Sequence, residues 1–300
     1  MSLHAWTSAR YVVPLPPGHR FPIEKYERLR QRVLAEGLVA SECLHEPPRV
    51  TPAQLLRVHT PEYVDRLTSG TMTAAEVRRL GFPWSPDLVE RSLRAVGGTC
   101  EAVRTALELG VAMNLAGGTH HAFATHGEGF CVFNDVAVAI REALAAGRIA
   151  RAAIIDLDVH QGNGTHAIFA DEPHVFTFSM HGGKNYPFHK VNGDLDIELD
   201  DGTGDDEYLA RLHDALPRVL AGAAPDLVVY LAGADPHEGD RLGRLALTFD
   251  GLARRDAMVL QAAREVGIPV AITIAGGYGR NIDDTVEVHC RTVRVASGYA

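Results

Sequence analysis

The 300-residue sequence lacks several features that would assign it to large classes of proteins. No run of 18 or more apolar residues occurs, so no membrane span is expected. Residues 1–19 lack the basic stretch and apolar core of a secretory signal peptide. The formal net charge of −9 leaves no surplus of Lys and Arg to neutralise phosphates, so we expect no direct nucleic-acid binding.

Cysteine is also scarce. The four cysteines, Cys43, Cys100, Cys131 and Cys290, are isolated and form no CxxC pair. This pattern is typical of a reduced, cytoplasmic protein rather than of a disulfide-rich one. No linker, internal repeat or low-complexity tract divides the chain, and 46% hydrophobic residues are enough for a large core. Residues 1–300 are therefore expected to form a single domain.

Apolar runs alternate with amphipathic stretches along the chain. Most runs are continuous, which is typical of parallel strands covered on both faces. Strands are expected at 10–15, 110–118, 152–158, 174–180, 226–233 and 269–277, and helices at 23–37, 86–108, 134–147, 205–222, 248–267 and 281–296. The alternation predicts a doubly wound α/β sheet. The long irregular stretches 111–133 and 181–204 are candidates for function.

Chemically active residues follow four of the expected strands. The segments are "GGTHH" (117–121), "DVH" (158–160), "GAD" (233–235) and "GGY" (276–278). In open α/β sheets, ligands bind outside the carboxyl ends of the strands. We therefore expect these four segments to meet at one edge of the sheet.

Two carboxylates and an imidazole in these segments indicate a metal site. Asp158 and His160 are expected to point the same way, because side chains alternate along an extended chain. With Asp235 they offer three ligands and leave a fourth position for water, which is the form of a catalytic zinc site. The alternative is a pair of solvated loop acids with Asp235 as a helix cap. The three together favour the metal, because carboxylates beside an apolar strand otherwise lack a partner.

The adjacent His120 and His121 indicate general acid–base work at the same edge. Asp156 and Asn163 are available to orient their rings. An anionic partner raises the basicity of an imidazole, whereas neutral Asn163 orients without raising it much, so the two histidines are expected to divide the roles. A structural role is the alternative for either histidine alone.

Tyr278 follows Gly276 and Gly277, which allow a tight backbone and bring the phenol close to a ligand. As a hydroxyl donor opposite a metal, it would complete an acyl-transfer site. Phe130 and Tyr186 are candidates for the walls of a narrow channel. Packing against the sheet edge is the alternative for each of these rings.

Four segments resemble, in order and context, the motifs of the zinc-dependent histone deacetylase family. They are "GGTHHAFATHGEGFCVFNDVAVA", "IIDLDVHQGNGT", "LAGADPHEGDRLG" and "IAGGYG", and the resemblance extends over nearly the whole chain. The compact length, Asn163 and "DGTGDDEYL" are most similar to the class IV branch and its bacterial relatives. The resemblance implies an arginase/deacetylase-like three-layer α/β/α sandwich with a mostly parallel sheet.

The resemblance also implies roles for individual residues. Zinc would be held by Asp158, His160 and Asp235. His120 would pair with Asp156 and His121 with Asn163, and Tyr278 would polarise the scissile carbonyl. Gly129, Phe130, Tyr186 and Gly277 would contact the substrate. A structural potassium or sodium ion would be held by Asp156, Asp158, His160, Ser179 and Met180.

The expected reaction is hydrolysis of an Nε-acyl-lysine amide on a protein or peptide. In the implied mechanism zinc lowers the pKa of its bound water towards about 7 and polarises the carbonyl. His121 accepts the water proton and later protonates the leaving amine, His120 helps electrostatically, and Tyr278 and zinc hold the oxyanion. Neutral Asn163 departs from relatives that have Asp there. Arg241 stands where Pro is frequent, which we interpret as loop variation, and His166, His174 and His237 are interpreted as loop or surface histidines.

Three alternatives remain open at this point. One is an amidohydrolase for acetylated polyamines or another small acylated amine, another a non-catalytic metal-binding module, and the third an arginase-type ureohydrolase. The tandem histidines and "GGY" disfavour the last two. The sequence leaves the acyl chain open, from acetyl to long fatty acyl, since it does not measure a pocket.

Overall fold

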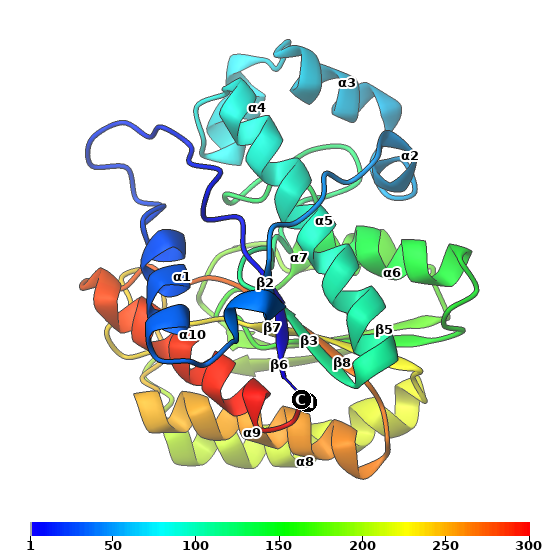
Figure 1. The fold of residues 1–300 in the computed structure, drawn as a ribbon, viewed down its shortest axis with the longest axis vertical. Helices are drawn as coiled ribbons and strands as arrows, with labels where there is room; N and C mark the ends of the chain where they lie inside the picture. The colour runs from blue at the N-terminus through cyan, green and yellow to red at the C-terminus, as the bar shows by residue number, and fades with distance from the viewer. Residues whose placement is uncertain (1) are drawn as a thin grey trace.

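The computed structural model describes residues 2–300, in which eight strands form one sheet (Figure 1). The strands lie in the order β2-β1-β3-β8-β7-β4-β5-β6, and all neighbouring pairs in this sheet are parallel. They are β1 His4–Trp6, β2 Leu44–His45, β3 Val111–Asn114, β4 Ala152–Asp156, β5 Val175–Gly182, β6 Leu195–Leu199, β7 Leu227–Ala232 and β8 Val270–Ile274.

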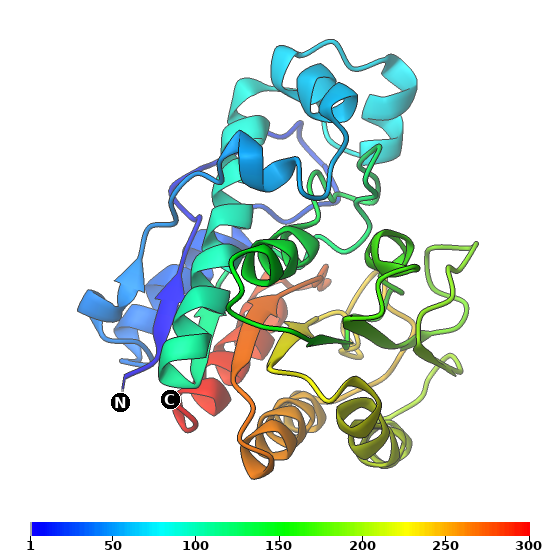
Figure 2. The same cartoon turned by 90° about the vertical axis from the view of Figure 1, so that its right-hand side faces the viewer.

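Helices cover both faces of the sheet and make a three-layer α/β/α sandwich, as predicted (Figures 1 and 2). One face is covered by α5 (Pro86–Leu109) and α6 (Asp135–Ala145). The other is covered by α1 (Lys25–Ala35), α8 (Asp205–Ala223), α9 (Phe249–Glu265) and α10 (Ile282–Ser297). Shorter helices are η1 (Ser41–Cys43), α2 (Pro52–Leu55), α3 (Pro61–Ser69), α4 (Ala74–Leu80) and α7 (Asn163–Phe169).

Strand β4 shows why the apolar runs are continuous. Ala152 and Ile154 pack in the cluster that contains α5 and α6. Ala153 and Ile155 face the opposite way and pack in the cluster that contains α8 and α9. Because both faces are covered, every position of the strand is buried and apolar until Asp156.

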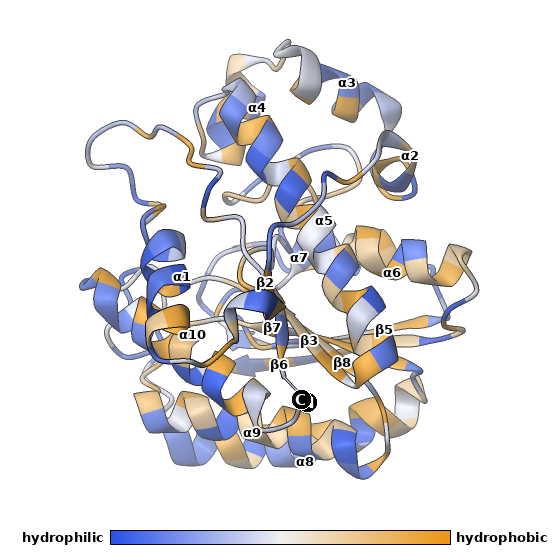
Figure 3. Cartoon of the chain, in the orientation of Figure 1, coloured by the Kyte–Doolittle hydropathy of each residue, from blue (hydrophilic) through white to orange (hydrophobic). Residues whose placement is uncertain are grey.

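The long helices begin and end at residues that the sequence supplies for that purpose. In α5, the Ser85 hydroxyl accepts a hydrogen bond from the Leu88 N–H, Pro86 takes the first helical position, and Gly110 ends the helix at φ 94°. The outer helices carry both hydrophobic and hydrophilic bands, as α8 and α9 show in Figure 3. Each helix therefore has an apolar stripe to bury against the sheet.

The sequence-based strand at 10–15 is wrong: these residues are irregular, and the first strand is β1 instead. Val12 is 60% exposed, so this apolar stretch does not lie in the sheet. The short strands β1, β2 and β6 were missed, and so were helices α2, α3, α4 and α7. Within residues 2–300, no helix is both long and apolar enough to cross a membrane.

Candidate active site

Asp158, His160 and Asp235 meet at the carboxyl end of the sheet. One ligand atom from each lies within 4.8 Å of the others, and all three residues are buried. Asp158 and His160 lie in the loop after β4, and Asp235 lies in the loop after β7. Because β4 and β7 are neighbours in the sheet, their ends bring the three side chains together.

The prediction that Asp158 and His160 lie in an extended strand with alternating side chains is wrong, because both residues lie in a bent loop beyond the end of β4. The Asp158 N–H donates to the Asp156 carboxylate at 3.1 Å, and the His160 N–H donates to the Asp158 carboxylate at 2.9 Å. Each aspartate thus hydrogen-bonds the backbone two residues further on and turns the chain. These two turns orient the side chains of Asp158 and His160 toward Asp235.

The cluster has the properties of a cation site. Oδ2 of Asp235 has no hydrogen-bond partner among residues 2–300, although Nδ1 of His160 lies 3.2 Å away. Burial and the neighbouring Asp158 carboxylate raise the pKa of Asp235 to about 7. A Cβ at Gly276 would lie 1.8 Å from that same oxygen, so only glycine leaves the space beside it free. Two buried carboxylates and one imidazole fit a divalent metal such as zinc.

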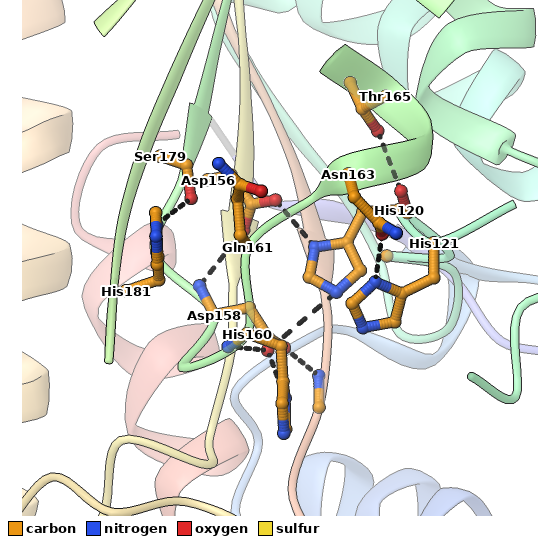
Figure 4. A network of polar contacts seen from close by, with 12 residues as sticks. His120, His121, Asp156, Asp158, His160, Gln161, Asn163, Thr165, Ser179 and His181 are labelled. Atoms are coloured by element: carbon orange, nitrogen blue, oxygen red, sulfur yellow. Dashed lines mark hydrogen bonds and ion pairs between the residues drawn. The ribbon is translucent and has the colours of Figure 1, made fainter. Parts of the chain in front are cut away.

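His120 and His121 lie side by side next to this cluster, with ring centroids 4.1 Å apart (Figure 4). Nδ1 of His120 lies 2.6 Å from Oδ2 of Asp156, and Nδ1 of His121 lies 2.7 Å from Oδ1 of Asn163. The two contacts join the histidines to the partners that the sequence analysis assigned. Each ring therefore contacts its partner through Nδ1, and its Nε2 remains available for other groups.

The two histidines differ in basicity. Burial lowers the pKa of His120, but the carboxylates of Asp156 and Asp158 outweigh it and raise that pKa to about 9. Burial lowers the pKa of His121 well below its usual value, and His120 and His160 lower it further. At neutral pH, His120 therefore carries a proton and His121 is neutral.

Tyr278 closes the site from the loop after β8. Its ring centroid lies 6.4 Å from that of His160. Burial first, and then the carboxylates of Asp235 and Asp158, raise the pKa of Tyr278 well above its usual value. The phenol stays protonated and is able to donate a hydrogen bond.

A cavity of about 360 Å³ opens onto these groups. Its lining includes Tyr278, His121, His160, Gly129, Phe130 and Tyr186. The ring of Tyr186 packs edge-on to that of His121 at 4.9 Å. Of the four residues expected to contact the substrate, Gly129, Phe130 and Tyr186 therefore line the cavity. Gly277 does not line it: a Cβ there would meet Thr285 and Ala234.

Comparison with known proteins agrees with this geometry. A model of the histone deacetylase domain matches residues 19–293. The chain belongs to the histone deacetylase family. This confirms the family predicted from the sequence and supports the predicted hydrolase.

Relatives and solved structures of this family cover most of the chain. An uncharacterized protein of Picosynechococcus sp. is 48% identical over 95% of both chains. Histone deacetylase 2 of Arabidopsis thaliana is 36% identical over 90% of this chain and 73% of its own. Histone deacetylase-like amidohydrolase of Pseudomonas aeruginosa is 30% identical over 88% and 74%. The crystal structure of an HDAC homolog from Aquifex aeolicus has a TM-score of 0.87 at 25% identity and covers 100% of this chain and 85% of that one.

Glu128 is a site residue of this deacetylase-family chain that the sequence analysis missed. Its Oε1 accepts hydrogen bonds from Nδ2 of Asn163 at 2.7 Å and from the hydroxyl of Tyr186 at 2.8 Å. The Glu128 carboxylate therefore holds Asn163, which contacts His121, and it also fixes Tyr186, which lines the channel. The sequence feature that could have indicated a role for Glu128 is its position two residues before Phe130.

Arg241, which was interpreted as loop variation, lies in a loop and contacts the main chain of Tyr278. Its Nε donates to the Tyr278 carbonyl at 2.9 Å, while the Tyr278 N–H donates to Asp240 at 2.6 Å. Both main-chain groups of Tyr278 are thus held by one loop. The interpretation as a loop or surface histidine is wrong for His166, which lies in helix α7 and is 2% exposed, whereas His237, although buried, does lie in a loop.

Ser179 and Asp156, two of the residues assigned to a monovalent cation, are register partners in β5 and β4. The Ser179 hydroxyl lies 2.9 Å from Nδ1 of His181. Met180 follows in the same buried strand. The cation itself stays a prediction.

Proposed function

We propose that residues 1–300 form one catalytic domain that hydrolyses the amide of Nε-acyl-lysine and uses a single zinc ion held by Asp158, His160 and Asp235. The observation that carries this proposal is a buried cluster of three potential metal ligands that opens onto the same cavity as His121 and Tyr278. When bound, zinc supplies a Lewis acid and lowers the pKa of water to about 7.

The side chains would then divide the remaining work. The water oxygen bonds to the acyl carbon and gives a tetrahedral oxyanion; the C–N bond then breaks, leaving a carboxylic acid and a free lysine. Neutral His121 takes the proton of the water and passes it to the leaving amine. Protonated His120 stabilises the negative charge that develops nearby, and the Tyr278 hydroxyl donates to the oxyanion.

The channel would hold the substrate in line with these groups. The carbonyl of Gly129 accepts the amide N–H of the acyl-lysine, and the rings of Phe130 and Tyr186 flank its aliphatic stem. Gly129 is at φ 56°, and a Cβ there would lie 2.8 Å from Cδ2 of His121. Glycine therefore lets the backbone approach the histidine closely enough to reach the amide.

The Tyr278→Phe variant tests the proposal. Loss of one oxyanion donor lowers kcat roughly 100-fold to 1,000-fold, and we expect that loss on acyl-lysine peptides with the fold intact. Tyr299→Phe, whose hydroxyl lies 3.4 Å from the Ala257 carbonyl, is the control and keeps wild-type turnover. Near-wild-type turnover of Tyr278→Phe would reject Tyr278 as the oxyanion donor, whereas a wild-type protein without turnover would leave a non-catalytic metal-binding module as the alternative.

An amidohydrolase for acetylated polyamines is the second candidate, and the charge around the channel disfavours it. Arg20, Lys184 and Arg244 line the mouth. A polyamine keeps positive charges on its other amines after acetylation, whereas an acyl-lysine is uncharged. These cations therefore repel an acetylated polyamine more than they repel an acyl-lysine within an acidic peptide. Side-by-side kcat/KM values on acetylspermidine and an acetyl-lysine peptide distinguish the two.

Three finer points belong to the same proposal. We assign the chain to the class IV branch on Asn163 and its compact length. We place a potassium or sodium ion beside Asp156, Asp158, His160, Ser179 and Met180. The preferred acyl chain is identified by comparing kcat/KM on peptides that carry acetyl-, octanoyl- or myristoyl-lysine.

A further inference from the structure

Arg255 lies on α9, outside the channel, and is 0% exposed. A guanidinium buried this deeply needs partners for its charge and its N–H groups. It finds a carboxylate on its own helix and two carbonyls just beyond the ends of β4 and β7. Those two carbonyls belong to the loops that carry the metal ligands.

One nitrogen of Arg255 joins these loops. Nη1 donates to the Gly233 carbonyl at 2.7 Å and to the Leu157 carbonyl at 3.2 Å. Leu157 directly precedes Asp158, and Gly233 precedes Asp235 by two residues. The Leu157 N–H still donates to the Leu231 carbonyl of β7 at 3.2 Å. Just beyond that ladder bond, Arg255 bridges the ends of the two strands.

The rest of the guanidinium is held firmly. Nε and Nη2 donate to Oδ1 of Asp256 at 2.9 and 2.7 Å. Asp256 in turn accepts the hydroxyl of Tyr230 at 2.5 Å and that of Thr292 at 2.6 Å. Strand β7, helix α9 and helix α10 therefore all fix the direction of Nη1.

We propose that Arg255 is a positioning residue that sets zinc affinity by holding the loops after β4 and β7 at the separation the three ligands require. This rests on the zinc site of the proposed function. The two loops are already in close contact, because a Cβ at Gly233 would lie 2.5 Å from Cα of Asp158. A small change in their separation therefore moves Asp158 and Asp235 relative to each other.

Arginine is suited to this position in a way that lysine is not. Its planar fork bonds Asp256 through two nitrogens while a third serves both carbonyls. A lysine ammonium keeps the charge but does not reach the same four contacts with that geometry. The Arg255→Lys variant consequently separates charge from positioning.

The test compares Arg255→Lys with Arg91→Lys in the metal-free protein. Arg91 is also buried, at 8% exposed, and its Nη1 donates to the carbonyls of Ser8 and Tyr11, both at 2.9 Å. Two measurements are made: the zinc dissociation constant, by competition with a chromophoric chelator, and the urea unfolding midpoint. We expect both variants to lower the midpoint, but only Arg255→Lys to weaken zinc binding, by about 10-fold to 100-fold.

Equal zinc affinities for the two lysine variants would overturn the proposal and leave Arg255 a structural residue. Thr292→Val provides a second route if Arg255→Lys does not fold, since it removes one of the two hydroxyls that hold Asp256 and leaves Arg255 in place. We expect its zinc affinity to fall in the same direction by less, and a wild-type value would overturn the proposal. A wild-type protein that binds no zinc would instead reject the proposed function itself.

Discussion

His121 and His120 are neighbours in the chain with similar burial, yet at neutral pH His120 is protonated and His121 is neutral. The carboxylate of Asp156 touches His120, whereas the carboxylate of Glu128 reaches His121 only through the amide of Asn163. The amide orients the ring and transmits little of the charge. This arrangement keeps His121 neutral, which its proposed role as a base requires.

Replacing the amide by a carboxylate should therefore move the pH dependence. In the double variant Asn163→Asp with Glu128→Gln, a carboxylate contacts His121 and favours its protonated form. The pKa of His121 in the folded protein therefore rises. Because the base acts in its neutral form, the acidic limb of the kcat/KM profile shifts to higher pH by the same amount.

Glu128→Gln alone is the control for that pH profile. It leaves the neutral Asn163 in contact with His121, so its acidic limb should stay close to that of the wild type. An unchanged limb in the double variant would show that His121 is not the base whose titration limits the rate.

At the scale of single residues, part of the site was readable from the sequence. The contacts among the three proposed metal ligands and between each histidine and its partner were predicted, because these residues lie in compact motifs at strand ends. Glu128 and Arg241 were not. They act through contacts with Asn163 and Tyr278, each more than thirty residues away, and no periodic pattern connects such loop residues.

At the scale of elements, the loop after β8 determines how closely the metal cluster is enclosed. The Gly276 N–H donates to Oδ2 of Asp158 at 2.7 Å, so the backbone itself is a wall of the cluster. A Cβ at this position would meet the carboxylates of both Asp158 and Asp235, at 2.6 and 1.8 Å. The carboxylates would have to move apart to admit a methyl group.

The Gly276→Ala variant should therefore lose zinc, with an affinity at least about 10-fold below wild type. Zinc content after dialysis, measured by atomic absorption, checks this. Gly204→Ala is the control, because a Cβ there has only the Ala246 carbonyl nearby, at 3.8 Å. A full equivalent of zinc on Gly276→Ala would contradict the placement of the metal.

The elements themselves were predictable to the extent that they are long and buried. Strands such as β4 and β7 are continuous apolar runs, and α5 and α9 have clear amphipathic periodicity. Strands β1 and β2, the last two at one end of the sheet, span three and two residues, too few for a period to appear. Strand β6 is largely half-exposed and carries acids, so it reads as a loop.

At the scale of the whole molecule, the net charge and the charge at the channel have opposite signs. The chain carries −9, yet the channel mouth carries Arg20, Lys184 and Arg244. Asp201 pairs with Arg244 at 3.1 Å and lies 3.9 Å from Lys184, so it compensates these cations only in part. The mouth should therefore attract acidic segments and repel basic ones over about a Debye length, ~8–10 Å at ordinary salt.

We expect acyl-lysine peptides with Asp or Glu beside the modified lysine to have a higher kcat/KM than peptides with Lys or Arg there. The double variant Arg20→Glu with Arg244→Glu should reverse this order, mainly through KM, and added salt should weaken the preference in both proteins. Arg211→Glu with Arg218→Glu changes the net charge equally on α8, far from the channel, and should keep the wild-type order. If both double variants changed the preference alike, net charge rather than the channel mouth would select the substrate.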